Sequence, residues 1–384
     1  MKLKALEDLG KPYTIYADSL DGGTIEQFVN AMSHEAVMSG VLLPDTHVGY
    51  SLPIGGVVLS KNVVFPAFVG YDIGCGVSTI QTSFNAEDIK KNDDRIFNAL
   101  YETIPTGVGR ENANPASGKR IEKLRAMKKS GVAHDHFESK GLKQQGQLGS
   151  GNHFLEVGFR EDGTIFLTVH SGSRNLGHSV ASHYMKIASG SDKPKEGVFG
   201  LDAKNAEGQA YLADMHFCTE YATLNRDIML EAALGVISKI VGTDPTKAVP
   251  AGAMRINKAH NFIEVTKDGC YLHRKGATIA GKGVLGVIPG NMRDGVFVVE
   301  GLGNANSLES CSHGAGRVMS RAKAKEAIEM EDFVTAMHGV KAKVTEGTLD
   351  ESPFAYKDIF NVMALQSDLA KVLFHIKPLI NIKG

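Results

Sequence analysis

The chain has 384 residues, of which 42% are hydrophobic and 22% are charged, and its formal net charge is −1. This length accommodates one large domain or two, and the composition is that of an ordinary globular protein. A nearly neutral chain generates no global field that attracts polyanions. Any nucleic-acid binding must therefore come from a local basic patch.

The four cysteines, Cys75, Cys218, Cys270 and Cys311, stand far apart and form no CxxC pair. This spacing argues against a disulfide framework and against a structural zinc ribbon. The first residues contain no apolar run typical of a signal peptide, and no window of about 18 apolar residues predicts a membrane span. We therefore expect a protein of the reducing cytoplasm without a membrane segment.

Short apolar runs predict strands in the first third of the chain, and amphipathic runs predict helices. The expected strands, from β-branched content and period-2 alternation, cover residues 41–43, 55–59 and 77–84. Helices are expected over 26–38 and 87–101. The turn-rich segment 105–118 predicts a surface loop over a site. The basic run 118–130 predicts a helix, either with a solvated face or in contact with nucleic acid.

The rest of the chain mixes hairpins with longer helices. We expect strands over 154–157, 164–171, 259–265, 269–274, 284–288 and 296–302, and helices over 174–187, 206–241 (with a break near Gly235) and 315–328. The apolar end, 372–383, should be tied into the body of the protein. No repeat, low-complexity tract or composition break marks a linker. The sequence therefore predicts an α+β fold in a single domain over residues 1–384.

Five side chains are candidates for a metal site. Asp72 and Cys75 lie three residues apart in the glycine-rich turn Gly70–Gly76, and glycine lets a chain turn tightly. His153, His170 and His260 each lie at or within a predicted strand, beside small or polar residues. Each of these residues alone is compatible with ordinary burial. Together, a thiolate, a carboxylate and three imidazoles make a full set for one or two divalent ions, and paired ions are common in phosphoryl transfer.

A second group surrounds His313, which precedes the turn Gly314-Ala315-Gly316 and the predicted helix 315–328. Free N–H groups at a helix start attract anions. Arg317 and Arg321, four apart on one helix face, could hold phosphate oxygens together with Arg174. His313 could then be a general acid, a metal ligand or a nucleophile. The alternative is a helix capped by Ser312 with solvated arginines.

Five motifs carry a resemblance to the RtcB RNA ligase family. They are Gly-Tyr-Asp-Ile-Gly-Cys-Gly, Gly-Ser-Gly-Asn-His-Phe-Leu-Glu, His-Ser-Gly-Ser-Arg, His-Arg-Lys-Gly-Ala-Thr and His-Gly-Ala-Gly-Arg. They occur in that family's order, and the resemblance spans residues 41–384. It implies an RtcB-like fold with mixed or antiparallel sheets around a central metal site and flanking helices.

The resemblance also implies an activity, a GTP- and Mn²⁺-dependent ligase, with two manganese ions. Such enzymes join RNA ends bearing a 3′-phosphate or 2′,3′-cyclic phosphate to 5′-hydroxyl ends, in RNA repair and tRNA processing. Manganese follows from the resemblance alone, because a thiolate ligand favours zinc.

Residue roles follow from the matched motifs. The resemblance makes Asp72, Cys75, His153, His170 and His260 the metal ligands and His313 the nucleophile that takes GMP. The resemblance assigns contacts with the nucleotide to Asn152, Phe154, Glu156, Asn291, Gly314, Ala315, Gly316 and Lys383. It assigns binding of the phosphates of RNA or GTP to Arg174, Arg317 and Arg321.

Two segments depart from the family's pattern. The nucleotide-pocket loop, usually Pro-Gly-Ser-Met-Gly-Thr-x-Ser, has Asn291 and Val296 at its serine positions, and the motif His-x-Gly-Lys-Gly has Tyr50 in place of the lysine. These departures favour a divergent branch specialised for the repair of a particular broken RNA. Two alternatives remain open. One is a metal-dependent phosphoesterase or cyclic phosphodiesterase that does not ligate, and the other is a non-catalytic binder of RNA ends.

Overall fold

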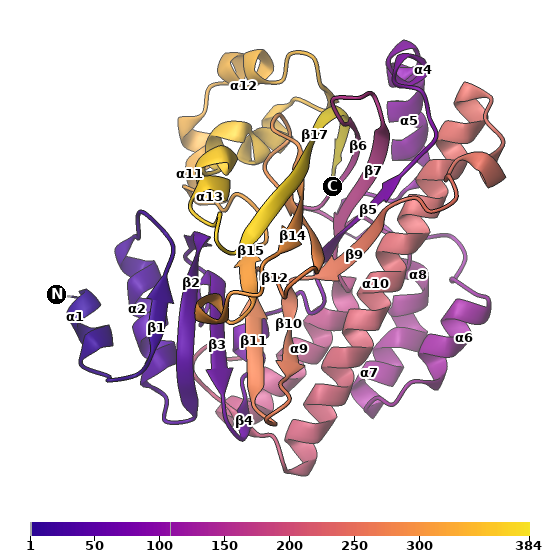
Figure 1. Ribbon diagram of the computed structural model, residues 1–384. Coiled ribbons are helices and arrows are strands. Elements are labelled where there is room, and N and C mark those ends of the chain that lie inside the picture. The colour runs from indigo at the N-terminus through magenta and orange to yellow at the C-terminus, as the bar shows by residue number, and fades with distance from the viewer. Residues whose placement is uncertain (1, 108) are drawn as a thin grey trace.

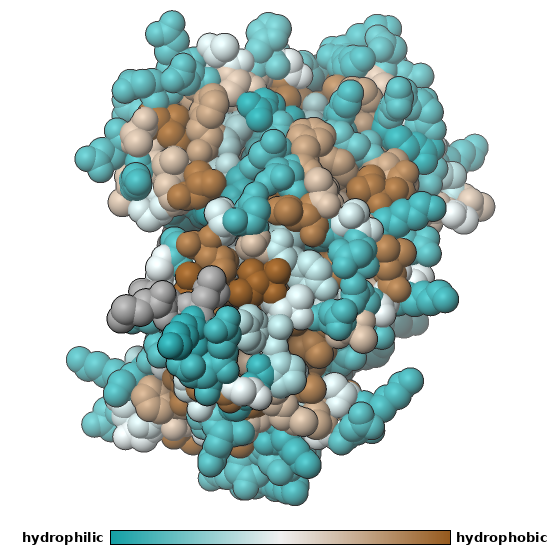
Figure 2. Space-filling model, turned by 60° about the vertical axis from the view of Figure 1, so that its left-hand side comes forward, coloured by the Kyte–Doolittle hydropathy of each residue, from teal (hydrophilic) through white to brown (hydrophobic). Residues whose placement is uncertain are grey.

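A computed structural model describes residues 2–107 and 109–384 (Figure 1). Helices and largely antiparallel sheets alternate along the chain, which confirms the predicted α+β class. On the face shown in Figure 2, hydrophobic residues gather across the middle, between mainly hydrophilic regions above and below. No helix among the described residues combines the length and the hydropathy that a membrane crossing requires.

An eight-stranded sheet forms the centre of the molecule, with strand order β13-β14-β17-β6-β7-β5-β9 and β16 paired to β17. Its strands are β5 (Gly76–Gln81), β6 (Phe154–Phe159), β7 (Ile165–Ser171), β9 (Arg255–Ala259), β13 (Leu285–Pro289), β14 (Val296–Gly301), β16 (Lys341–Ala342) and β17 (Ala370–Lys383). The C-terminal strand β17 lies inside this sheet, between β14 and β6. Ile376, Ile380 and Ile382 of β17 are buried. The prediction that the apolar end is tied into the body is therefore confirmed.

A five-stranded sheet of order β1-β2-β3-β11-β10 lies beside it. Its strands are β1 (Tyr13–Ile15), β2 (Val37–His47), β3 (Ile54–Ser60), β10 (Asn261–Val265) and β11 (Tyr271–Lys275). Two short ladders complete the strand set, β4 (Val63–Val64) with β8 (Leu201–Asp202), and β12 (Ala277–Ile279) with β15 (Ser310–Ser312). The predicted hairpins 154–171 and 259–274 are both present as antiparallel pairs.

Helices cover the sheets from several sides. The α-helices are α1 (Lys2–Glu7), α2 (Gly22–Ser33), α3 (Pro66–Val69), α4 (Ala86–Lys91), α5 (Asp93–Thr103), α6 (Lys119–Ala126), α7 (Gly131–His136), α8 (Leu142–Gln144), α9 (Arg174–Ser189), α10 (Ala206–Val241), α11 (Arg321–Ala327), α12 (Met330–Ala336) and α13 (Ile359–Ala364). Shorter helical turns are η1 (Phe137–Gly141), η2 (Pro245–Lys247), η3 (Ala305–Ser307), η4 (Glu346–Glu351) and η5 (Pro353–Ala355).

The long helix α10 runs along the back of the central sheet (Figure 1). Met229, Leu230 and Ile237 of α10 share a buried core with Leu167 and Val169 of β7. The helix is continuous from residue 206 to 241, so the break expected near Gly235 is absent. A methyl group at Gly235 would meet no neighbouring atom, which shows that no close approach requires glycine there.

Three predicted helices have different bounds in the structure. Asp21 accepts a hydrogen bond from the Thr24 backbone and starts α2 four residues before Glu26. This helix ends at Ser33, because the chain enters β2 at Val37. The predicted helix 87–101 is two helices, α4 and α5, interrupted at Asn92. The predicted helix 118–130 ends at residue 126, where the backbone becomes extended.

The predicted helix 315–328 is wrong over residues 315–320. Gly316 has a φ of 75°, and a Cβ there would lie 2.1 Å from the carbonyl oxygen of Asp45. Close packing against β2 therefore keeps this segment in an irregular turn. The helix α11 begins only at Arg321, capped by Ser320. Arg317 and Arg321 consequently do not share a helix face, and the turn after His313 does not open a helix.

Candidate active site

The strand register brings the predicted metal ligands to one edge of the central sheet. Val77 of β5 pairs with His170 of β7, and Phe154 of β6 pairs with the same His170. Gly76 pairs with Ala259 at the end of β9. Cys75, His153 and His260 each lie one residue beyond these paired positions. Residues separated by up to 185 positions therefore meet because their strands are neighbours.

Distances within this group are short. The Sγ atom of Cys75 lies 3.4 Å from Nε2 of His153 and 3.3 Å from Nε2 of His170. One carboxylate oxygen of Asp72 lies 3.1 Å from Nε2 of His153. The ligand atoms of Cys75, His153 and His170 all lie within 4.8 Å of one another, and all three residues are buried. The ring of His260 stands 5.1 Å from that of His170, centroid to centroid.

Burial sets the protonation of the cluster. It lowers the pKa of His153, His170 and His260, so the imidazoles are neutral and can donate lone pairs to a metal. Burial also raises the pKa of the Cys75 thiol, which needs a nearby cation to ionise. For Asp72, burial alone would raise the pKa, but hydrogen bonding to His153 lowers it overall. A compact set of nitrogen, sulfur and oxygen donors fits a divalent transition-metal ion.

His313 lies next to this cluster, with its ring 4.7 Å from that of His260. Its Nδ1 lies 2.6 Å from Oδ2 of Asp45, a residue that is fully buried at the end of β2. Because an ionised carboxylate only accepts hydrogen bonds, Nδ1 carries a proton, and in the neutral ring the lone pair is then on Nε2. Burial would raise the pKa of Asp45, but the hydrogen bond from His313 lowers it. The site therefore contains an oriented imidazole with one reactive nitrogen.

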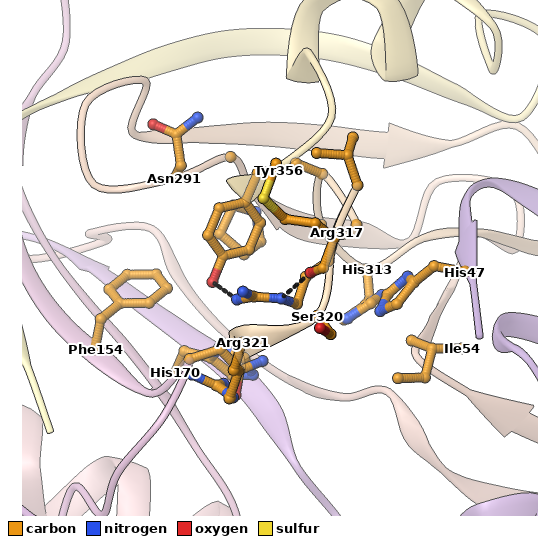
Figure 3. A pocket seen from close by; sticks show the side chains of 18 of the residues that line it. His47, Ile54, Phe154, His170, Asn291, His313, Arg317, Ser320, Arg321 and Tyr356 are labelled. Carbon is orange, nitrogen blue, oxygen red and sulfur yellow. Dashed lines mark hydrogen bonds between the residues drawn. The ribbon is translucent and has the colours of Figure 1, made fainter. Parts of the chain in front are cut away.

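A cavity of about 670 Å³ opens beside His313 (Figure 3). His313 and His47 lie on one side of it and Phe154 on the other, with Arg317 between them (Figure 3). Of the predicted site residues, the lining includes Asn152, Phe154, His170, Asn291, His313, Gly314, Ala315, Gly316, Arg317, Arg321 and Lys383. His170 belongs both to this lining and to the metal cluster. The cavity and the candidate metal centre are therefore adjacent.

Four polar groups converge on Glu351, the last residue of η4. Lys383 Nζ lies 2.7 Å from its carboxylate, Arg321 donates to it, and Tyr356 donates at 2.6 Å. Arg317 is 3.5 Å away and also donates to the Asp350 carbonyl at 2.8 Å. Burial alone would raise the pKa of Glu351, but the neighbouring cations lower it to about 2. One buried carboxylate thus fixes three cavity-lining cations in place.

The wall that adjoins Glu351 comes from β6 and β17. Lys383 pairs with Phe154 in the register, and its ammonium lies 5.6 Å from the Phe154 ring centre and 3.3 Å from the Asn152 carbonyl. Glu156 accepts a hydrogen bond of 3.0 Å from Asn381, which lines the cavity. Glu156 lies outside the lining, and burial raises its pKa to about 8.

Arg174 and Asn291 have surroundings different from those of the other predicted phosphate and nucleotide contacts. The Arg174 guanidinium lies 3.0 Å from Nδ1 of His153, beside the metal cluster and outside the cavity lining. The Asn291 side chain lines the cavity but bonds within its own loop, to the Asp294 carboxylate at 2.7 Å and to two backbone N–H groups. Figure 3 shows it pointing away from the other labelled side chains.

The turn-rich segment 105–118 does not cover the cavity beside His313, as far as its described residues show. Gly107 donates to the Gly149 carbonyl, and Ala116 to the Leu142 carbonyl, so the segment lies along residues 142–149. Thr106, Gly107 and Arg110 line a second cavity that also includes Lys383. The prediction of a loop over the site is therefore wrong for the cavity described above.

Several residues of the site had not been predicted from the sequence. They are Asp45, His47, Glu351, Tyr356 and Asn381. A weak signal existed for the first two, since Asp45-Thr46-His47 is a polar run directly after an apolar strand. Burial lowers the pKa of His47 to about 4 and keeps it neutral, although a hydrogen bond to the Asp45 carbonyl opposes this shift. Glu351 lies in a polar stretch without any distinguishing pattern.

Comparison with known proteins shows the family. The model of the family RtcB, described as tRNA-splicing ligase RtcB, matches residues 27–384. The chain belongs to the RtcB family. It is 32% identical to the RNA-splicing ligase RtcB of Escherichia coli strain K12, over 94% of this chain and 93% of that protein. The tRNA-splicing ligase RtcB of Archaeoglobus fulgidus is 29% identical, over 95% and 92% of the two chains. The cluster around Cys75 and, apart from Asp21, the lining of the cavity beside His313 lie within the matched region of this RtcB family member.

Proposed function

We propose that this protein is an RNA ligase that joins a 3′-phosphate or 2′,3′-cyclic phosphate end to a 5′-hydroxyl end, using GTP and Mn²⁺. Its reaction passes through a covalent histidine–GMP intermediate on His313. Its role is the repair of broken RNA, or tRNA processing, in the cytoplasm. The observation that carries the proposal is the oriented His313, which stands between a donor cluster and a cavity lined by cations.

His313 is prepared for nucleophilic attack. With Nδ1 bonded to Asp45, the lone pair of Nε2 attacks the α-phosphorus of GTP, and the bond to pyrophosphate breaks. The Asp45 carboxylate balances the positive charge that the ring gains in this step. The RNA 3′-phosphate then takes GMP from His313. The 5′-hydroxyl attacks the activated phosphate, and GMP leaves. A cyclic phosphate is first opened by hydrolysis.

The cations of the cavity are arranged for phosphate oxygens. Arg317, Arg321 and Lys383 surround Glu351, so they are held at one side of the cavity before any ligand arrives. Fixed cations stabilise developing negative charge without reorganisation. A base-binding wall lies beside them. Oδ1 of Asn381, which lines the cavity, has no hydrogen-bond partner among the described residues, and an N–H donor of a guanine base would satisfy it.

The donor cluster fits a divalent ion held by Cys75, His153, His170 and Asp72, with His260 beside them. When bound, such an ion neutralises phosphate charge next to His313. The shared position of His170 between cluster and cavity supports this role.

Incubation with α-labelled GTP and Mn²⁺ tests the proposal. We expect a covalent label that is stable in alkali and released by acid, as a phosphoramidate requires. The variant His313→Ala should take no label, and Asp45→Asn should label on the order of 100-fold more slowly. His338→Ala, a change at an exposed histidine, is the matched control and should label normally. Full labelling of His313→Ala, or none of the wild type, would refute the mechanism.

One observation favours the alternative of a metal-dependent phosphoesterase or cyclic phosphodiesterase. The Asn291 side chain bonds to Asp294 and its own loop, which leaves fewer groups for the nucleotide than a serine-rich loop offers. This alternative requires hydrolysis of a terminal phosphate or cyclic phosphate without GTP, and no joined product. A ligation assay on a broken stem-loop, with each nucleoside triphosphate in turn, separates the two reactions.

A further inference from the structure

The segment from His47 to Tyr50 forms a wall of the cavity that leads outward from His313. His47 is half-buried and lies beside His313 in Figure 3. Val48 and Tyr50 follow, with 47% and 58% of their surfaces exposed, and both line the same cavity. A polymer whose end reacts at His313 and which leaves along this wall meets the Tyr50 ring. Tyr50 also stands at the position of the lysine in the motif His-x-Gly-Lys-Gly.

The Tyr50 ring belongs to an ordered aromatic group. It lies 5.7 Å from the Tyr71 ring at 86°, an edge-to-face arrangement. Tyr71 in turn stacks on His178 at 4.7 Å, and its hydroxyl donates to Glu196 at 3.0 Å. The ammonium of Lys275 lies 5.6 Å from the centre of the Tyr50 ring. Tyr71 is followed in the chain by Asp72, one of the candidate metal ligands.

The backbone beneath the ring is held in place. The Gln27 amide donates to the carbonyl oxygens of Gly49 and Tyr50, both at 2.8 Å. It also accepts from the Gly49 N–H at 2.9 Å. Three hydrogen bonds to one side chain of α2 fix the direction in which Tyr50 projects. An exposed aromatic side chain that is held so firmly loses little further freedom when a flat ligand covers it.

We propose that Tyr50 is a stacking platform for one unpaired base of the RNA, within a few nucleotides of the reacting end. This inference rests on the proposed function, because it takes RNA as the substrate. Aromatic side chains bind unpaired bases by stacking, largely irrespective of base identity. A cation near the ring supports such contacts. The platform positions the strand so that its end reaches His313.

Abasic RNAs test the platform. The probes are single-stranded RNAs with a 3′-phosphate, and a matched set with a 5′-hydroxyl, each lacking one base at the first to fourth nucleotide. For the wild type, we expect one abasic position to weaken binding about 5- to 100-fold. The variant Tyr50→Leu should weaken binding of the complete RNA by a similar factor and should be insensitive to that abasic position. Tyr50→Phe, which keeps the ring, should behave like the wild type.

A second variant and a fluorescent base make the test independent of folding. Tyr50→Lys should lose sensitivity to the abasic position and gain about 0.7 in the slope of log affinity against log salt, as one added phosphate contact requires. A 2-aminopurine at the sensitive position should be quenched by the wild type and by Tyr50→Phe only. Thermal unfolding confirms that each variant is folded.

The failure of this inference is distinct from the failure of the proposed function. One outcome is that the wild type takes the GMP label, but Tyr50→Leu and every abasic position lower the affinity for RNA independently, so that their effects add when they are combined. The platform is then overturned, while the ligase proposal stands. If the wild type takes no label and binds none of the RNAs, the proposed function fails and the platform fails with it.

Discussion

Three carboxylates, Asp45, Glu156 and Glu351, are buried around the cavity, and their neighbours determine their charge. Burial opposes ionisation of all three. Hydrogen bonding to His313 nevertheless lowers the pKa of Asp45, and Lys383 with Arg321 lowers that of Glu351 to about 2. For Glu156, burial outweighs the hydrogen bond from Asn381 and the charge of Lys383, so its pKa rises to about 8. Two of the three therefore act as anions at neutral pH, and Glu156 is largely protonated.

Glu156 should make stability depend on pH. Its folded pKa of about 8 lies above the ordinary value of 4.5. Between these values the folded state binds a proton that the unfolded state has released, so stability falls as pH rises from about 4.5 to 8. The loss reaches at most about 1.4 kcal/mol per pH unit. Glu156→Gln removes this dependence, and its melting temperature should fall less than that of the wild type between pH 5.5 and 8.5.

Melting curves over this pH range, measured without nucleotide, check the expectation. Glu161→Gln, at an exposed position on the β6–β7 turn, is the matched control and should follow the wild type. Parallel pH profiles for the wild type and Glu156→Gln would contradict the shifted pKa.

At the scale of elements, one turn of α10 holds the loops that carry the metal ligands. The Asn225 side chain accepts from the backbone of Gly146 and Gln147 at 2.7 and 3.1 Å and donates to the Gly172 carbonyl at 3.2 Å. The guanidinium of Arg226 is buried and donates to the carbonyls of Gly74 and Ser171, at 2.9 and 2.8 Å. Gly74 precedes Cys75, and Ser171 follows His170. Two adjacent residues of the longest helix thereby fix the position of two candidate ligands.

The variant Arg226→Met should destabilise the protein and weaken metal binding. It leaves two buried carbonyls without donors, at a cost of about 2 to 4 kcal/mol in the free energy of unfolding. Loosened loops should also lower the affinity for a divalent ion. Chemical denaturation gives the first quantity and titration calorimetry the second. Arg226→Lys keeps the positive charge but not the guanidinium group. It should retain part of the stability and part of the metal affinity.

A surface arginine provides the comparison. Arg160 pairs with Asp162 on the β6–β7 turn, and Arg160→Met should change stability by less than about 1 kcal/mol. If Arg226→Met destabilised the protein no more than Arg160→Met, the proposed role of this turn of α10 would be wrong.

Elements with a clear local pattern could be predicted from the sequence. The alternating, β-branched segments became β3, β5, β7 and β14, and the apolar spacing of residues 206–241 became α10. The helix predicted over 315–328 forms only from Arg321, where alanines and lysines favour helix, and residues 315–320 do not join it. Contact of Gly316 with the Asp45 backbone holds the turn open until Ser320. Tertiary packing overrode propensity there, and no local pattern reveals such a contact.

At the scale of the whole molecule, the site depends on long-range pairing. The residue types at Cys75, His153, His170 and His260 suggested ligands, but their meeting follows from the strand order β6-β7-β5-β9. The partner of His313, Asp45, is 268 residues away in sequence. Glu351 organises residues 317, 321, 356 and 383, which lie on separate elements. Composition and spacing could name candidate chemistry, but they could not pair residues across such distances.

Because the candidate ligands come from four separate segments, a bound ion should stabilise the fold as a whole. A ligand that binds only the folded state adds about 2.7 kcal/mol at a concentration 100 times its dissociation constant. We therefore expect the melting temperature of the wild type to rise with added Mn²⁺ and to fall after chelation.

Cys75→Ala removes the donor that contacts both His153 and His170, and should abolish metal retention and both shifts in melting temperature. Cys270→Ala, at a partly exposed thiol elsewhere, is the control and should respond like the wild type. Elemental analysis that finds full metal in Cys75→Ala would show that the thiolate is not the shared ligand. The centre would then depend on the imidazoles and Asp72 alone.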